Sequence, residues 1–157
     1  MRIRSLPVIA LFFAPLPVLL ASSAQAQESL TFEQATAAMD AAEAEGRRNQ
    51  WNLTIVITDA EGTPIYLRRM DGASARTYQI AMAKTRTALA AGTSTGEYGQ
   101  ALAAGRADTI PDGIRFEGGY VIRIGGQIVG AMSASGARGS EDAQAVRAGL
   151  DAIGAEH

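Results

Sequence analysis

Residues 53–70 read LTIVITDAEGTPIYLRRM, and this segment is the most informative part of the chain. Its first six residues alternate large apolar side chains with threonine and are rich in β-branched types, which is typical of a strand. Residues 59–62 supply turn-forming side chains, and the chain then returns as a second strand from Pro64. Proline is tolerated only at the start of a strand or on a sheet edge. The segment therefore predicts a β-hairpin and, with it, an antiparallel sheet.

A second hairpin is predicted at residues 120–133, where Gly125-Gly126 is a two-residue turn signal between two strands. Helices are predicted where apolar residues recur at spacings of three and four. These helices cover residues 31–46, 76–91, 94–103 and 140–153. The order helix, hairpin, helix, short helix, hairpin, helix predicts an α/β (α+β) domain whose helices cover the faces of an antiparallel sheet.

The N-terminal residues 1–26 have the pattern of a secretory signal peptide. Arg2 and Arg4 precede an apolar run, and Ala24-Gln25-Ala26 supplies small residues at a cleavage site. Prolines interrupt the apolar run, which is also short for a membrane span. We expect cleavage after Ala26 and a mature chain of residues 27–157 that forms one domain. We therefore expect a periplasmic or secreted protein with no membrane span after cleavage.

The composition excludes several classes of site. The chain has no cysteine, so thiolate metal sites, iron–sulfur clusters and cysteine nucleophiles are excluded, and its one histidine is the last residue, His157. Without Arg2 and Arg4 the formal charge would be −4, and there is no basic run, so nucleic acid is not an expected partner. No nucleophile stands at a recognisable spacing from a base, so we assign no catalytic residue and favour binding over catalysis.

Several segments follow one another in a recognisable order: Val56-Ile57-Thr58-Asp59, Arg69-Met70-Asp71-Gly72-Ala73, Gly118-Gly119-Tyr120-Val121-Ile122 and residues 130–136. Together with Lys84, Thr95, Asp142 and Ala148-Gly149, they resemble the GlcG/HbpS-like family, some of whose members bind or degrade haem. Ser94 and Val121 stand where the family has proline. The resemblance covers about residues 30–154. It implies a profilin-like fold, namely an antiparallel sheet of four to five strands with helices on both faces, and it implies homo-oligomers.

Seven residues are candidate ligand contacts: Arg69, Asp71, Arg76, Lys84, Thr95, Ser135 and Gly136. Asp71-Gly72 and Ser135-Gly136 end strands before helices, where free backbone N–H groups can hold an anion, although such residues also simply make turns. Arg69 and Arg76 can pair with carboxylates or can be a solvated sheet edge. Lys84, the only lysine, is either a carboxylate partner or a solvated side chain, and Thr95 is either a ligand contact or a helix cap.

We predict a small-ligand-binding homo-oligomer whose ligand is haem or a similar anionic tetrapyrrole. Its pocket is expected between residues 76–91 and the sheet, with Arg76 and Lys84 near the anionic end, or at a subunit interface. The iron ligand stays open, because Cys is absent and His157 is terminal. The remaining candidates are Tyr78, Tyr98, Tyr120, Met70 and Met82. The alternatives are an accessory protein that docks on a periplasmic oxidoreductase or sensor, and a haem-degrading enzyme.

Overall fold

The computed structural model describes residues 29–157, so the predicted signal peptide lies outside the described residues. Four helices and four strands follow one another in the predicted order. They are α1 (Phe32–Arg48), β1 (Thr54–Asp59), β2 (Pro64–Arg69), α2 (Ala75–Ala91), α3 (Thr95–Ala103), β3 (Gly119–Ile124), β4 (Gln127–Ser135) and α4 (Gly139–Ala152). Both predicted hairpins and all four predicted helices are confirmed. No helix among these is long and apolar enough to cross a membrane.

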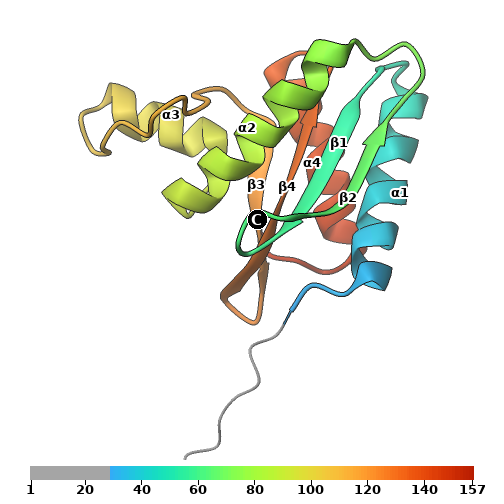
Figure 1. Ribbon diagram of the computed structural model, residues 1–157, viewed down its shortest axis with the longest axis horizontal. Coiled ribbons are helices and arrows are strands. Elements are labelled where there is room, and N and C mark those ends of the chain that lie inside the picture. Colours follow the sequence, from blue (N-terminus) through green and yellow to red (C-terminus); the bar gives the residue numbers. More distant parts are fainter. Residues whose placement is uncertain (1–28) are drawn as a thin grey trace, which may run out of the picture.

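The four strands form one antiparallel sheet in the order β2-β1-β4-β3. The two hairpins are joined through β1 and β4, which occupy the centre of the sheet. Thr54 at the start of β1 lies opposite Arg69 on one side and Ser135 on the other. Because every pair is antiparallel, β2 and β4 end on the side of the sheet where β1 and β3 begin. We call this side, which runs across the ends of all four strands, the upper edge. This edge is uppermost in Figure 1.

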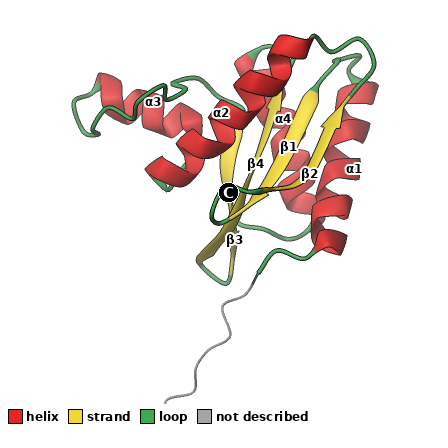
Figure 2. Ribbon diagram, in the orientation of Figure 1, coloured by secondary structure: helices red, strands yellow, loops and turns green. Residues whose placement is uncertain are grey.

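Helices cover both faces of the sheet, as predicted. Helices α1 and α4 lie side by side behind the sheet, and α2 crosses its front (Figures 1 and 2). The core on the α1 and α4 side contains Met39, Ile55, Ile57, Met132 and Leu150, all fully buried. Helix α3 extends away from the body beyond the end of α2. The structure therefore has the architecture that the sequence predicts, with four strands.

The two positions where proline is absent have local explanations. Ser94 is the N-cap of α3, and its side chain accepts a hydrogen bond from Glu97 N while the Glu97 carboxylate accepts one from Ser94 N. This reciprocal arrangement is a capping box, which a proline could not form. Val121 is buried within β3, opposite Ala131. Ser94 thus caps a helix, and Val121 packs inside a strand.

Candidate functional site

The upper edge of the sheet brings together several of the predicted ligand contacts. Arg69 and Asp71 stand at the end of β2, Ser135 and Gly136 at the end of β4, and Arg76 in the first turn of α2. The two loops approach each other through one residue, Asn52. A Cβ on Gly72 would lie 2.7 Å from Asn52 Nδ2, and one on Gly136 would lie 2.1 Å from Asn52 O. Gly72 therefore leaves room for the Asn52 side chain and Gly136 for the Asn52 backbone, which agrees with a turn-making role.

Arg69, Asp71, Arg76 and Gly136 are exposed at this edge, whereas Ser135 is 4% exposed. The expected space between α2 and the sheet is occupied by side chains of the helix itself. Its buried residues are Thr77, Ala81, Lys84, Thr85, Thr87 and Ala88. Arg76 at the surface and Lys84 in the interior are thus not two ends of one open pocket. Ligand binding by the seven candidate residues stays a prediction.

Lys84 forms an ion pair in the interior of the protein. Its Nζ donates to Asp142 Oδ2 and to Ala134 O, both at 2.8 Å, and the side chains are 0% and 3% exposed. The second oxygen of Asp142 accepts from Ala137 N at 3.0 Å. The ring of Phe116 lies above the amine, with its centroid 5.1 Å from Nζ. The amine is therefore satisfied internally and is not offered to solvent.

Burial acts on both members of this pair. Loss of water lowers the pKa of Lys84 and raises the pKa of Asp142, because each charged form is less well solvated inside the protein. The attraction between the two charges opposes both shifts. Sequence reasoning singled out Lys84 as the only lysine but gave no role to Asp142, because its partner lies 58 residues away.

Thr95 supports the turn that precedes β3. Its hydroxyl donates to Phe116 O at 2.7 Å and accepts from Gly119 N at 3.1 Å. Gly118 in the same turn has φ +107°, and a Cβ there would lie 2.4 Å from Lys84 Nζ. Thr95, Gly118 and Lys84 thus hold one structural unit together. These contacts give Thr95, Gly118 and Lys84 a structural role that requires no ligand.

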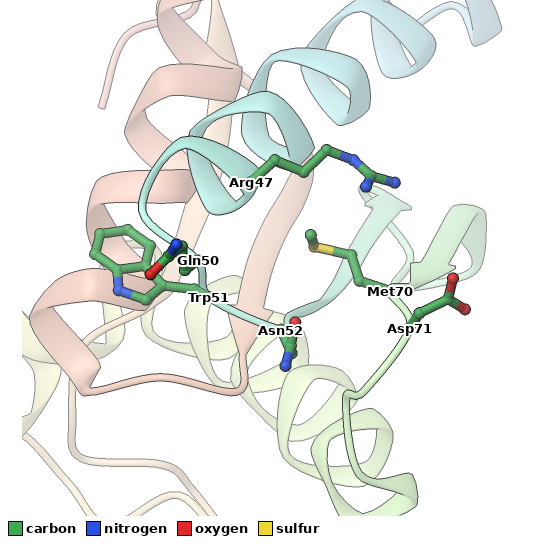
Figure 3. A pocket seen from close by; sticks show the side chains of 6 residues that line it. All are labelled: Arg47, Gln50, Trp51, Asn52, Met70 and Asp71. Atoms are coloured by element: carbon green, nitrogen blue, oxygen red, sulfur yellow. The ribbon is translucent and has the colours of Figure 1, made fainter.

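One hollow lies at the upper edge, between the end of α1, the start of β1 and the end of β2. It is lined by Arg47, Gln50, Trp51, Asn52, Met70 and Asp71. Figure 3 shows Arg47, Met70 and Asp71 on one side of it and Trp51 with Gln50 on the other. Its volume is about 240 Å³. Sites that enclose a drug-sized ligand usually measure about 300–1,000 Å³, so this hollow is small for a tetrapyrrole.

Two further hollows of about 270 Å³ each adjoin one another along the edge strand β3. We call their union the β3 groove. Both are lined by Ser94, Glu97, Tyr120 and His157. The other lining residues are Gly92, Thr93, Gly96, Gln100, Glu117, Val121, Arg123, Arg147 and Glu156. The groove therefore combines the start of α3, the strand β3, one residue of α4 and the C-terminal residues.

The side chains of the β3 groove are held by specific contacts. Tyr120 Oη accepts a hydrogen bond from Arg147 Nη1 at 2.8 Å. The ring of His157 meets the Tyr120 ring edge-on, with centroids 6.2 Å apart, and its Nε2 lies 2.9 Å from Asp151 Oδ1. Arg123 donates to Gly92 O at 2.9 Å. The groove thus holds a phenol, an imidazole and two guanidinium groups.

Three carboxylates also line the groove, which is therefore of mixed charge. Glu97 accepts hydrogen bonds from Thr93 and Ser94, and these hold its pKa below the usual value. Glu117 and Glu156 are exposed. Within residues 29–157, no three side chains of the His, Asp and Glu types gather as a bare metal site would require.

Comparison with known proteins identifies the family. The chain matches the family described as "Haem degrading protein HbpS-like" over residues 30–151. The chain belongs to the HbpS-like family. This HbpS-like protein is 33% identical to Protein GlcG of Escherichia coli (strain K12) over 108 residues, which are 68% of this chain and 81% of that protein. The predicted resemblance is therefore confirmed.

Solved structures of similar proteins share the fold of this HbpS-like protein. The PduOC:heme complex is 25% identical, with a TM-score of 0.76, and the match covers 82% of this chain and 98% of that one. A double mutant of HbpS from Streptomyces reticuli is 29% identical, with a TM-score of 0.72 and coverage of 92% and 97%. Haem is thus the ligand in one solved relative of this family.

The β3 groove was only partly foreseen from the sequence of this HbpS-like protein. Tyr120 was among the possible iron ligands, but His157 was not counted among them because it is the last residue. In the structure the backbone beside it pairs with β3, because Glu156 N donates to Arg123 O at 3.0 Å. Nothing in the local sequence indicated Arg147, which reaches the groove from α4. Tyr120 could be recognised as a candidate from the sequence, whereas its hydrogen-bond partner Arg147 could be identified only from the structure.

Proposed function

We propose that this HbpS-like protein is an exported binding protein for haem or a similar anionic tetrapyrrole. Family membership and the haem complex of PduOC support the ligand class. The observation that carries the proposal is the β3 groove, where Tyr120 and His157 lie beside Arg123 and Arg147. Phenolate and imidazole are both known haem-iron ligands, and guanidinium groups pair well with carboxylates such as propionates.

The residues of the groove fit a haem by the chemistry of their donors. Tyr120 or His157 would hold the iron, Arg147 would support Tyr120 through their hydrogen bond, and Arg123 would pair with a propionate. The bound group would supply an iron centre able to change oxidation state. The protein's own part is to orient the macrocycle, to balance its charges and to limit its exposure to water.

Export fits the N-terminal pattern of residues 1–26, and N-terminal sequencing of the secreted chain tests it by looking for Gln27 as the first residue.

We also propose that the protein forms a homo-oligomer, and that a second copy completes the enclosure of the ligand. Each hollow of the groove measures only about 270 Å³ and opens to solvent. Large apolar side chains are also exposed elsewhere, with Phe32 at 65% and Phe116 at 50%. Light scattering on the purified chain, with and without haemin, measures the assembly directly. A monomer in both states would contradict this part of the proposal.

Titration with haemin tests the binding function. We expect a saturable shift of the Soret band at about one haem per chain. Replacing both groove arginines, Arg123→Met with Arg147→Met, is expected to weaken binding at least tenfold. Arg86→Met with Arg106→Met, at two exposed sites outside the groove, is the matched control for loss of two positive charges. The absence of any shift at micromolar haemin would refute the haem proposal and would favour the accessory docking protein.

Haem degradation is a second candidate function, because the family description includes it. It has a separate readout. If the protein degrades haem, the Soret absorbance of the complex will decline with hydrogen peroxide faster than that of haemin in buffer, and a linear tetrapyrrole will appear. Equal rates of loss would leave binding as the function.

A further inference from the structure

We infer that the phenol oxygen of Tyr120 is the ligand of the haem iron in the β3 groove and that Arg147 is its positioning residue. This inference rests on the proposed function and assigns the iron ligand within it. Both side chains line the groove, and their contact is 2.8 Å long. A tyrosine ligand has its own spectroscopic signals, so the assignment can be tested by spectroscopy as well as by affinity.

Tyr120 is held more firmly than any other candidate in the groove. It lies in β3 opposite Met132, is half-buried, and packs against the hydrophobic core. Arg147 reaches its oxygen from α4, a helix that packs on the same sheet. The phenol is therefore fixed by a strand at one end and by a helix at the other. A ligand held in place before binding loses less conformational freedom when the metal arrives.

The charge of Arg147 suits an anionic iron ligand. Tyrosine binds ferric iron through its negatively charged oxygen. A guanidinium that already donates to that oxygen compensates the negative charge and fixes the direction of the remaining lone pairs. Arg147 thus acts through Tyr120 and need not touch the iron. Loss of the Arg147 charge should therefore change the iron–oxygen bond while leaving the fold intact.

His157 is the competing ligand in the groove, and its geometry is less favourable. Its Nε2 pairs with Asp151 Oδ1 at 2.9 Å, and the Asp151 side chain is 70% exposed. Its neighbouring backbone is attached to the sheet by one hydrogen bond, from Glu156 N to Arg123 O. The imidazole meets the phenol edge-on, which fits a wall of the site rather than its metal ligand.

The other tyrosines are outside the groove. Tyr98 is buried, and its oxygen accepts a hydrogen bond from Ile110 N at 2.8 Å. Tyr78 is 45% exposed on α2. Tyr66 is the informative comparison, because Arg68 donates to its oxygen at 2.6 Å on the opposite edge strand, β2. A phenol with a guanidinium partner therefore occurs twice, once inside the groove and once outside it.

The mixed charge of the groove also fits this assignment. Two arginines stand among three carboxylates, Glu97, Glu117 and Glu156. A purely anionic ligand would meet repulsion from these carboxylates. Ferric haem combines a positive centre with negative propionates, so both signs of charge in the groove have a counterpart. The tyrosine oxygen, with Arg147 as its partner, would meet the centre, and Arg123 would meet a propionate.

The test compares Tyr120→Phe with Tyr66→Phe in the full-length protein, purified and loaded with haemin. Both changes remove only a hydroxyl that accepts from an arginine, so they are closely matched. For the unaltered protein we expect a phenolate-to-iron charge-transfer band and a phenolate–iron vibration in the resonance Raman spectrum. Tyr120→Phe is expected to lose both signals and to weaken haemin binding at least tenfold. Tyr66→Phe is expected to keep both, and circular dichroism checks the fold of each variant.

Two more variants separate the roles of the neighbours. Arg147→Met is expected to retain bound iron with a shifted charge-transfer band, and Arg147→Lys is expected to restore the band in part. His157→Ala is expected to keep the phenolate signals. Haemin binding by the unaltered protein without those signals, or their persistence in Tyr120→Phe, would overturn the ligand assignment alone. Failure of the unaltered protein to bind haemin would overturn the proposed function and the assignment together.

Discussion

Removing the amine of Lys84 should be among the most destabilising single changes in the domain. Lys84→Met keeps most of the aliphatic chain, so little packing is lost. It leaves the Asp142 carboxylate, which is 3% exposed, without its counter-ion and leaves Ala134 O without a donor. Breaking a buried pair in this way costs about 3–5 kcal/mol. For a domain of this size that loss lowers Tm by about 10–20 °C.

The assay is urea unfolding at pH 7, followed by far-ultraviolet circular dichroism. Arg86→Met is the control, because Arg86 is exposed on the same helix two residues away. In the double variant Lys84→Met with Asp142→Asn, the loss should be smaller than the sum of the two single losses by about 1–3 kcal/mol. A cost below about 1 kcal/mol for Lys84→Met, or strict additivity in the cycle, would refute the reasoning.

The pH dependence of the same variant is a sharper check. Burial raises the pKa of Asp142, so the folded protein holds this proton more tightly than the unfolded chain does. A raised carboxyl pKa means that stability decreases as pH rises through it. Without the Lys84 charge, the hydrogen bond from Ala137 N still opposes the raising effect, but the attraction of the counter-ion is gone. The penalty of Lys84→Met should therefore be larger at pH 8 than at pH 5, and urea midpoints at the two values measure the difference.

Five further substitutions, at three places in the structure, have expected outcomes. Thr58 Oγ1 is buried and has no hydrogen-bond partner among the described residues, so Thr58→Val should be neutral or stabilising by about 1 kcal/mol in urea unfolding. Thr54→Val breaks a buried 2.6 Å contact with the Thr77 hydroxyl and should cost about 1–2 kcal/mol in the same assay. The lowered pKa of Glu97 contributes stability that is lost as pH falls below 4.5, so thermal unfolding of Glu97→Gln should depend less on pH between 5 and about 3. Gly118→Ala should cost about 3 kcal/mol or more, because the new Cβ would collide with the buried Lys84 ammonium. Gly126→Ala, at φ +77° with open space around it, should cost about 1 kcal/mol. Equal losses of Tm in the two variants would contradict the role given to the collision.

Local patterns predicted the elements of the fold, because each element depends on its own residues. Alternation in residues 53–70 and the Gly125-Gly126 turn gave both hairpins, and helical spacing gave the four helices. The pairing of β1 with β4 joins the two hairpins, and it places Thr54 opposite Ser135. No local pattern encodes contacts across such a separation. That antiparallel pairing is what gathers Arg69, Ser135 and Gly136 at one edge.

The candidate site was less accessible to sequence reasoning for the same physical reason. A solitary lysine is conspicuous in a sequence, but the burial that pairs Lys84 with Asp142 follows from how α2 and α4 pack on the sheet. Tyr120 met its arginine partner only through the packing of α4 against β3. The prediction of haem binding came from the resemblance, because composition alone argued only against thiolate and histidine-rich sites.

The ion pair between α2 and α4 also bears on how long the folded state lasts. It joins residues 58 positions apart, with α3 and the whole second hairpin between them. Both helices must be docked before the two charges meet, so the contact is expected to form after the rate-limiting step of folding. Interactions absent from the transition state mainly slow unfolding. Stopped-flow measurements on Lys84→Met should then show a faster unfolding limb and an unchanged refolding limb, so that this single contact governs the lifetime of the native protein rather than the speed with which it is reached.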